Sequence, residues 1–209
     1  MSDQSVPSWL TWAREIQALC QTGLAFSEVR YDIQRYRRLM EIAAEIVSAH
    51  STLERGPLRD NFLSQTGYAT PKIDVRGAAV RDGKILLVQE RVDQRWCMPG
   101  GWADIGDIPS EMVAREVLEE SGFRVTPRKV IGVYDANRGG GPLEFYHAFK
   151  IVFLCEIIEG EARGSDETMD ARFFSFDALP PLSSPRTDVR HLLEIQEHLK
   201  DPARPAAFD

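Results

Sequence analysis

The sequence predicts an α+β fold, in which a mixed β-sheet lies between helices and a small helical domain precedes it. Three observations support this class. Apolar residues recur at helical intervals over residues 9–63, and the pattern changes to extended, alternating segments after residue 72. One amphipathic helical segment interrupts the extended ones, and a second one closes the chain.

The N-terminal part begins with two long helical patterns. Pro7 and Ser8 suit a helix start, and apolar residues follow at helical spacing over 9–26. Ser27 can cap a second helix, in which an apolar stripe over 29–47 is too broad to stay exposed to water.

A third, shorter helical piece is expected near residues 58–63. Three such helices bury little by themselves, so we expect them to pack on the second domain or on another subunit, and we predict a homodimer. The expected organisation is a helical domain over 1–66, a linker over 67–72 that contains Pro71, and a second domain over 73–209.

Strand patterns dominate the second domain. Residues 73–80 alternate, and the Asp82-Gly83 turn signal joins them to an apolar segment at 85–90, as in a β-hairpin. Further strands are expected at 96–98, 129–134, 143–157 and 171–176, and a closing helix at 189–199.

Composition narrows the class of function. The net charge of −7 argues against nucleic acid as the main partner, because binding to duplexes depends on Lys and Arg at phosphates. An arginine cluster over 30–38 is an exception that fits either a phosphate contact or a solvated helix face. We expect no membrane-spanning segment, and three widely spaced cysteines suit a reducing cytoplasm.

The most informative segment is an acidic helix behind a glycine-rich loop. If residues 110–121 are helical, Glu116, Glu119 and Glu120 project from one face, because their spacing is i, i+3 and i+4. Unneutralised like charges at these spacings cost about 0.2–0.5 kcal/mol each, a penalty that a divalent metal ion held by oxygen ligands reverses. The segment therefore predicts a metal site.

The structural alternative is a solvated helix face. Glu111, Arg115 and Glu119 would then form an i, i+4 ladder of exposed ion pairs. This alternative leaves Glu116 and Glu120 without partners, and it does not account for the glycines that bracket the helix at positions 100, 101, 106 and 122.

Residues 101–123 resemble the Nudix box, Gly-x5-Glu-x7-Arg-Glu-(aliphatic)-x-Glu-Glu-x-Gly-(apolar), in order and spacing. One position departs, because Asp107 stands where the family has Glu. The resemblance covers about 73–199 and implies the Nudix fold, an α/β/α sandwich with a mixed sheet.

The N-terminal part is similar to the extension of a Nudix subgroup that acts on nucleoside diphosphates linked to another group. The similarity lies in the segments Trp9-Leu-Thr-Trp12, Tyr31 to Arg38 and Met98 to Asp104. By this resemblance we expect ADP-ribose, a sugar nucleotide or a CDP-alcohol as the substrate, rather than a nucleoside triphosphate.

The resemblance also implies a set of site residues. Glu116, Glu119 and Glu120 would bind Mg²⁺, for which Mn²⁺ can substitute, together with the carbonyl oxygen of Gly101. Arg115 would orient a catalytic glutamate, and Glu116 is itself a candidate for the base.

In this family the base often comes from a later loop. Glu167, just before the strand expected at 171–176, is the candidate at a spacing that resembles this arrangement, with Asp166 and Asp170 as competitors. A solvated acidic loop without a catalytic role stays open as the alternative.

Substrate selection is expected from the glycine-rich loop over 135–142, where Arg138 would meet a phosphate. A flexible connection without such a role is the alternative. Trp102 would either stack on a base or pack against the protein. Tyr146 and His147 are expected to begin the next strand.

These expectations combine into one function. A diphosphate bridge resists attack because its oxygens are negatively charged, so catalysis must neutralise charge and position a water molecule. The sequence predicts a Mg²⁺-dependent pyrophosphohydrolase that releases a nucleoside monophosphate and a phosphorylated remainder. The alternatives are an RNA-directed Nudix hydrolase and a catalytically silent, nucleotide-sensing Nudix module.

Overall fold

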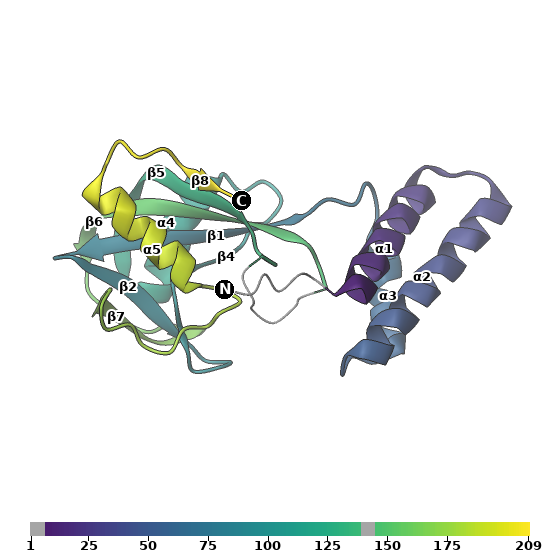
Figure 1. Cartoon of the computed structure of the whole chain (residues 1–209), viewed down its shortest axis with the longest axis horizontal. Coiled ribbons are helices and arrows are strands. Elements are labelled where there is room, and N and C mark those ends of the chain that lie inside the picture. Colours follow the sequence, from purple (N-terminus) through teal and green to yellow (C-terminus); the bar gives the residue numbers. More distant parts are fainter. Residues whose placement is uncertain (1–6, 139–144) are drawn as a thin grey trace. The chain divides into compact units, whose positions relative to one another are not determined.

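The computed structural model describes residues 7–138 and 145–209. These residues form two compact units. The helical unit comprises residues 7–71 and 145–147, and the sheet unit comprises residues 72–138 and 148–209 (Figure 1). Lys72, which was expected in the linker, is the first residue of the sheet unit's first strand.

The helical unit contains α1 (Ser8–Phe26), α2 (Arg30–His50) and α3 (Arg55–Ser64) among the described residues. Gly23 allows α1 and α2 to pack closely, because a Cβ atom there would lie 2.5 Å from the Tyr36 ring. The buried core of the unit consists of Ala13, Cys20, Met40, Ala43, Ala44, Val47 and Phe62.

The start of the second helix differs from the prediction. Ser27 is the C-terminal cap residue of α1, and its backbone N–H donates to the Gly23 carbonyl. The residue that caps α2 is Val29, which has no side-chain hydrogen bond to offer. The helix is therefore stabilised by packing of its apolar face rather than by its cap.

Residues 145–147 were expected to begin a strand, and this prediction is wrong. Phe145 instead packs on the core of the helical unit, where its ring stacks on Phe62 with the centroids 4.5 Å apart. The Phe145 carbonyl accepts a hydrogen bond of 2.5 Å from Arg14 Nε. The strand begins only at Ala148, and residues 143 and 144 lie outside the described residues.

The described part of the sheet unit holds an eight-stranded mixed sheet. The strands are β1 (Lys72–Arg81), β2 (Lys84–Glu90), β3 (Trp96–Cys97), β4 (Gly100–Trp102), β5 (Phe123–Asp135), β6 (Ala148–Gly160), β7 (Thr168–Ser175) and β8 (Ala207–Phe208). In the sheet, the strands follow one another in the order β3, β2, β1, β6, β5 and β8, while β4 pairs with β1 and β7 pairs with β2. β1 runs parallel to β6, and β5 runs parallel to β8.

Two helices cover opposite faces of this sheet. α4 (Pro109–Ser121) buries Val113 and Val117 in one core, which includes Val75 of β1. α5 (Val189–Lys200) buries Leu192 and Ile195 in a second core, on the other side of the sheet. Figure 1 shows α5 across the near face. The expected α/β/α sandwich with a mixed sheet is thus confirmed.

None of the described helices has the length and apolar character that crossing a bilayer requires.

Candidate metal and active site

The acidic helix and the glycine loop meet at the start of β4. β4 pairs with β1, so that Gly101 lies opposite Val75 and Gly100 opposite Arg76. Gly100 adopts φ +139°, and a Cβ atom there would lie 2.0 Å from the Val75 carbonyl oxygen. Only glycine fits such a close approach of two backbones.

Two glutamates of α4 reach this loop. The Gly100 N–H donates to Glu120 Oε2 over 3.0 Å, and Glu116 Oε2 lies 3.6 Å from the position of a Cβ atom on Gly101. Because Glu116 and Glu120 are spaced i, i+4, one face of α4 presents both carboxylates to the same short strand. Glu119 is exposed to solvent.

Burial and like charge work against ionisation of these two carboxylates. Burial raises the pKa of Glu120 to about 7, and the negative charges of Glu90 and Glu116 add to this, while Arg76 and the Gly100 N–H oppose it. Burial also raises the pKa of Glu116, with smaller contributions from Glu119 and Glu167 and an opposing one from Arg115. A cation between these oxygens would relieve both costs.

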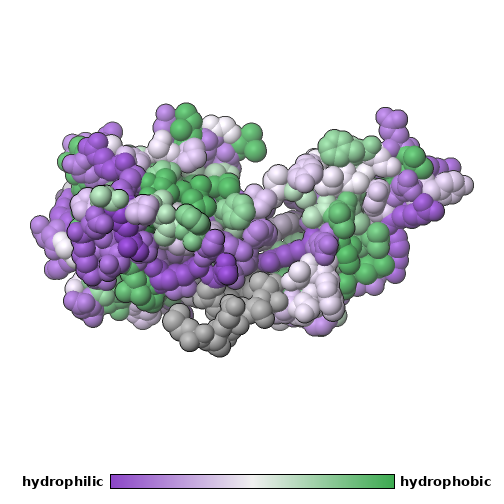
Figure 2. All heavy atoms as spheres, turned by 45° about the horizontal axis from the view of Figure 1, so that its top comes forward, coloured by the Kyte–Doolittle hydropathy of each residue, from purple (hydrophilic) through white to green (hydrophobic). Residues whose placement is uncertain are grey.

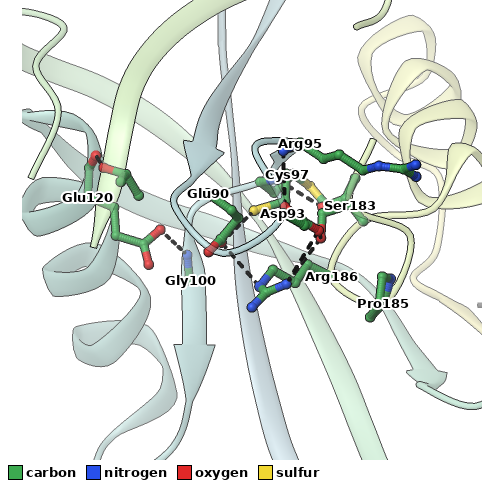
Figure 3. A network of polar contacts seen from close by, with 12 residues as sticks. Glu90, Asp93, Arg95, Cys97, Gly100, Glu120, Ser183, Pro185 and Arg186 are labelled. Atoms are coloured by element: carbon green, nitrogen blue, oxygen red, sulfur yellow. Dashed lines mark hydrogen bonds and ion pairs between the residues drawn. The ribbon is translucent and has the colours of Figure 1, made fainter. Parts of the chain in front are cut away.

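Glu90, at the end of β2, is a carboxylate that the sequence analysis missed. Its Oε1 accepts a hydrogen bond from Cys97 Sγ over 3.1 Å and lies 3.2 Å from Arg186 Nε. Figure 3 shows Glu90 and Glu120 on either side of Gly100. Glu90 ends a strand that is buried over most of its length, and an acidic residue directly after such an apolar run is the signal that could have found it.

Arg115 joins the loop to the helix. Its guanidinium donates to both carboxylate oxygens of Asp107, over 3.0 and 3.1 Å, and to Glu116 Oε1 over 3.3 Å. The hydrogen bonds from Arg115 to Asp107 lower the pKa of Asp107. Within the described residues Arg115 pairs with neither Glu111 nor Glu119, so the ladder of exposed ion pairs is not formed.

Glu167 lies in the loop between β6 and β7, directly before Thr168. The Thr168 hydroxyl donates to the Glu120 carbonyl over 2.7 Å, which ties this loop to the last turn of α4. The charge of Glu167 also contributes to the raised pKa of Glu116. The structure thus brings Glu167 toward the carboxylates of α4.

Trp102 and Arg138, the two residues expected to contact the substrate, have fewer contacts that link them to the carboxylates of α4. Trp102 is the last residue of β4, next to the glycine pair, and its side chain is 50% exposed. Arg138 is exposed in the turn after β5, where its backbone N–H donates to the Asp135 carbonyl. The rest of that loop, residues 139–142, lies outside the described residues.

The donor set suits a hard divalent cation. Among the described residues no three Asp, Glu, His or Cys side chains converge on one point as a ready metal cage. Mg²⁺ does not require such a cage, because it keeps several waters and binds through one or two carboxylates together with substrate phosphates. Glu116 and Glu120, with the backbone oxygen of Gly101 nearby, fit this requirement.

Comparisons with known proteins agree with this geometry. Residues 71–193 match the NUDIX domain, and residues 7–62 match the "UDP-X-like, N-terminal oligomerisation domain". The chain is 39% identical over 201 residues to the "Putative ADP-ribose pyrophosphatase YjhB" of Bacillus subtilis (strain 168), which spans 96% of this chain and 97% of that protein.

Solved structures that are similar to this chain include the following two. A UDP-X diphosphatase is 29% identical with a TM-score of 0.62, and the match covers 97% of this chain and 98% of the other. An ADP-ribose pyrophosphatase from Streptococcus suis is 35% identical with a TM-score of 0.61, and the match covers 67% of this chain and 100% of the other.

Proposed function

This chain belongs to the Nudix family and is a Nudix hydrolase, and we propose that it cleaves the diphosphate of a nucleoside diphosphate linked to a second group. One water molecule adds across the phosphoanhydride. Its oxygen joins one phosphorus, and the bridging oxygen leaves with the other phosphate and takes up a proton. The products are a nucleoside monophosphate and the phosphorylated second group.

The observation that carries this proposal is the meeting of Glu116 and Glu120 with the glycine pair of β4. Both carboxylates have raised pKa values, because Glu120 is buried, Glu116 is partly buried, and both are close to other negative charges. A protein keeps such a costly arrangement where the charge is used, and perturbed carboxylates at a loop–helix junction are typical of functional sites.

The cofactor in this proposal is Mg²⁺, with Mn²⁺ as a substitute. Glu116, Glu120 and the Gly101 carbonyl would hold it, with Glu119 completing the set from the solvent side. When bound, the ion neutralises the phosphate oxygens and lowers the pKa of coordinated water. Arg115 keeps Glu116 in place, since it binds Asp107 through both carboxylate oxygens and Glu116 through a third hydrogen bond.

Glu167 is the proposed general base. It lies on the loop held against the last turn of α4, and its exposed carboxylate is free to accept a proton from an attacking water. Glu116, which Arg115 already holds, is better suited to bind metal than to move protons.

The relatives support the proposed substrate class. The proteins named as ADP-ribose pyrophosphatases and the UDP-X diphosphatase support a nucleoside diphosphate joined to another group, with ADP-ribose as the first candidate. Trp102 would stack on the base, and Arg138 would contact a phosphate or the second group.

The helical unit is proposed to form a homodimer. Its match to an oligomerisation domain supports this, as do large apolar side chains of α1 that face solvent. Trp12, Leu19 and Phe26 are 59%, 64% and 72% exposed, and they repeat every seven residues along the helix. Figure 2 shows hydrophobic side chains on the visible surface of this unit.

The RNA-directed alternative is less well supported. Within the arginine cluster of α2, Arg35 pairs with Asp32, and Arg38 pairs with Glu41 and Glu45. Ion pairs of this kind are typical of a solvated helix face and leave less positive charge for a phosphate backbone. A silent sensing module is also disfavoured, because the three helix glutamates of the box, Glu116, Glu119 and Glu120, are all present.

A nucleotide panel tests the proposal. The purified protein is incubated with ADP-ribose, UDP-glucose, CDP-choline, NAD-capped RNA and ATP, with Mg²⁺ or with EDTA, and products are identified by mass spectrometry in H₂¹⁸O. We expect a nucleoside monophosphate from one of the first three substrates, only with Mg²⁺, and the ¹⁸O label identifies the attacked phosphorus. Activity confined to capped RNA, or none at all, contradicts the proposal.

A further inference from the structure

The loop between β6 and β7 is tied to the end of α4 at two points. The last four carbonyls of a helix have no partner within the helix. Two of these carbonyls bind the loop, because the Arg163 N–H donates to the Ser121 carbonyl over 3.0 Å and the Thr168 hydroxyl donates to the Glu120 carbonyl over 2.7 Å. Of these two hydrogen bonds, the one from Thr168 is made by a side chain, and the one from Arg163 is made by the backbone.

A second group of hydrogen bonds closes the loop on itself. The Ser165 N–H donates to the Thr168 carbonyl over 3.0 Å, and the Ser165 hydroxyl lies 3.0 Å from the Thr168 hydroxyl. The N–H groups of Glu167 and Thr168 both donate to Ser165 Oγ over 3.1 Å. The backbone of Glu167 is therefore fixed on both sides, while its side chain faces solvent.

This arrangement determines where Glu167 lies. Consecutive Cα atoms are about 3.8 Å apart, so the backbone of Glu167 is one residue away from a side chain bonded to the last turn of α4. That turn belongs to the helix that carries Glu116 and Glu120. The electrostatic effect of Glu167 on Glu116 agrees with this placement.

Thr168 itself is buried, with 1% of its surface exposed. A valine of the same shape would fill the space but would leave the Glu120 carbonyl and the Ser165 hydroxyl without this partner. A serine would keep the hydroxyl. The chain therefore offers a pair of substitutions that separates hydrogen bonding from packing.

We propose that Thr168 is a positioning residue for hydrolysis, whose hydroxyl holds the Glu167 carboxylate beside the metal-binding face of α4. The inference rests on the proposed function, because it requires Glu167 to act on the attacking water. In this role Thr168 acts through the loop that it ties to the Glu120 carbonyl.

A double-mutant cycle tests this inference on the full-length enzyme, with the substrate found in the panel and saturating Mg²⁺. Loss of a general base lowers kcat by roughly 10²–10⁴-fold, so E167Q should lower kcat by about 100-fold with little change in KM. Displacement of the base by about 1 Å can cost up to about 10²-fold, and we expect T168V to lower kcat by about 10-fold or more. T168S should stay within about twofold of the wild type.

The decisive comparison is T168V in the E167Q background. If Thr168 acts through Glu167, the second substitution lowers kcat by less than about twofold there. A merely structural threonine would lower kcat by the same factor in both backgrounds, and that result overturns the inference. Unchanged kcat in T168V or in E167Q also overturns it.

The matched control is S121A. The Ser121 hydroxyl is buried in the same turn and donates to the Val117 carbonyl over 2.5 Å, but it does not bind the loop. We expect S121A to keep the wild-type kcat, and loss of activity equal to that of T168V would overturn the inference. If the wild type is active and E167Q leaves kcat unchanged, the inference fails but the proposed hydrolase function stands. If the wild type is inactive on every nucleotide, the proposed function and the inference both fail.

Discussion

The carboxylate of Glu120 is buried and lies near other negative charges, and both conditions disfavour its ionised form in the metal-free protein. Its side chain is 6% exposed and lies close enough to Glu90 and Glu116 for both charges to raise its pKa. Arg76 and the Gly100 N–H partly offset this cost. Because the opposing groups do not suffice, the ionised Glu120 destabilises the folded chain until a cation is present.

This imbalance predicts that E120Q stabilises the metal-free protein at high pH. The folded-state pKa of about 7 exceeds the ordinary value of 4.5, so the folded protein binds more protons than the unfolded chain between these values. Stability is therefore lost as the pH rises through this window. Glutamine carries no charge, and its advantage should grow from near zero at pH 4.5 to at most about 3 kcal/mol at pH 8.

Urea unfolding with EDTA at pH 5 and pH 8 measures this difference. E111Q is the control, because Glu111 is an exposed residue in the first turn of the same helix. If E120Q raises the free energy of unfolding by the same amount at both pH values, the pKa of Glu120 is not raised in the folded protein and the prediction is wrong.

The box residues show what a single sequence can and cannot reveal about a site. Helical spacing was enough to place Glu116 and Glu120 on one face of α4. Glu90 was missed because it comes 30 residues before Glu120, on another strand, and only the fold brings the two together (Figure 3). Asp107 still reaches both donors of Arg115, although it is shorter than glutamate.

At the scale of elements, local patterns identified the segments whose burial alternates or repeats. The hairpin of β1 and β2, with its Asp82-Gly83 turn, was predicted to within a residue at each end. The bounds of α4 and α5 were predicted equally closely. In these segments local propensity and tertiary packing favour the same structure, so that the pattern is unambiguous.

β5 shows why other elements were misjudged. It was expected only over 129–134, but it begins at Phe123, directly after α4. Pro127 lowers the strand signal, since proline cannot donate to a β-ladder. The structure accommodates it with a register shift between Pro127 and Lys129, so the strand continues past a residue that normally ends one.

The segment around Phe145 failed for a different reason. Its apolar residues continue into the run of β6, and periodicity alone cannot separate the two. Phe145 is instead held by Arg14 and Phe62, which lie more than 80 residues away along the chain. Contacts of this range leave no trace in a local pattern.

At the scale of the whole molecule, the fold and the family could be predicted from the sequence. The proposed role of the helical unit in dimerisation depends on the exposed apolar surface of α1. Within this unit, α1 buries Leu10, Ala13 and Cys20 but leaves Trp12 and Leu19 exposed. A helix that is apolar on two sides usually packs on both of them.

We therefore predict a dimer at micromolar concentration in sedimentation velocity. L19E, at the centre of the exposed stripe of α1, should shift the protein to monomers, because a charge there would be buried at the interface. T11E adds the same charge at an exposed position on the same helix outside the stripe, and it should remain dimeric. A wild-type monomer, or a dimer that persists in L19E, contradicts this role for α1.

The central claim is that the carboxylates of α4 gather divalent ions, and calorimetric titration of Mn²⁺ into the metal-free protein at pH 8 tests it most directly. The wild type and E111Q should bind Mn²⁺ with equal affinity, while E116Q and E120Q should bind it at least about 10-fold more weakly, in line with the loss of a metal ligand. Equal affinity in all four proteins, or no binding by the wild type, would contradict the account.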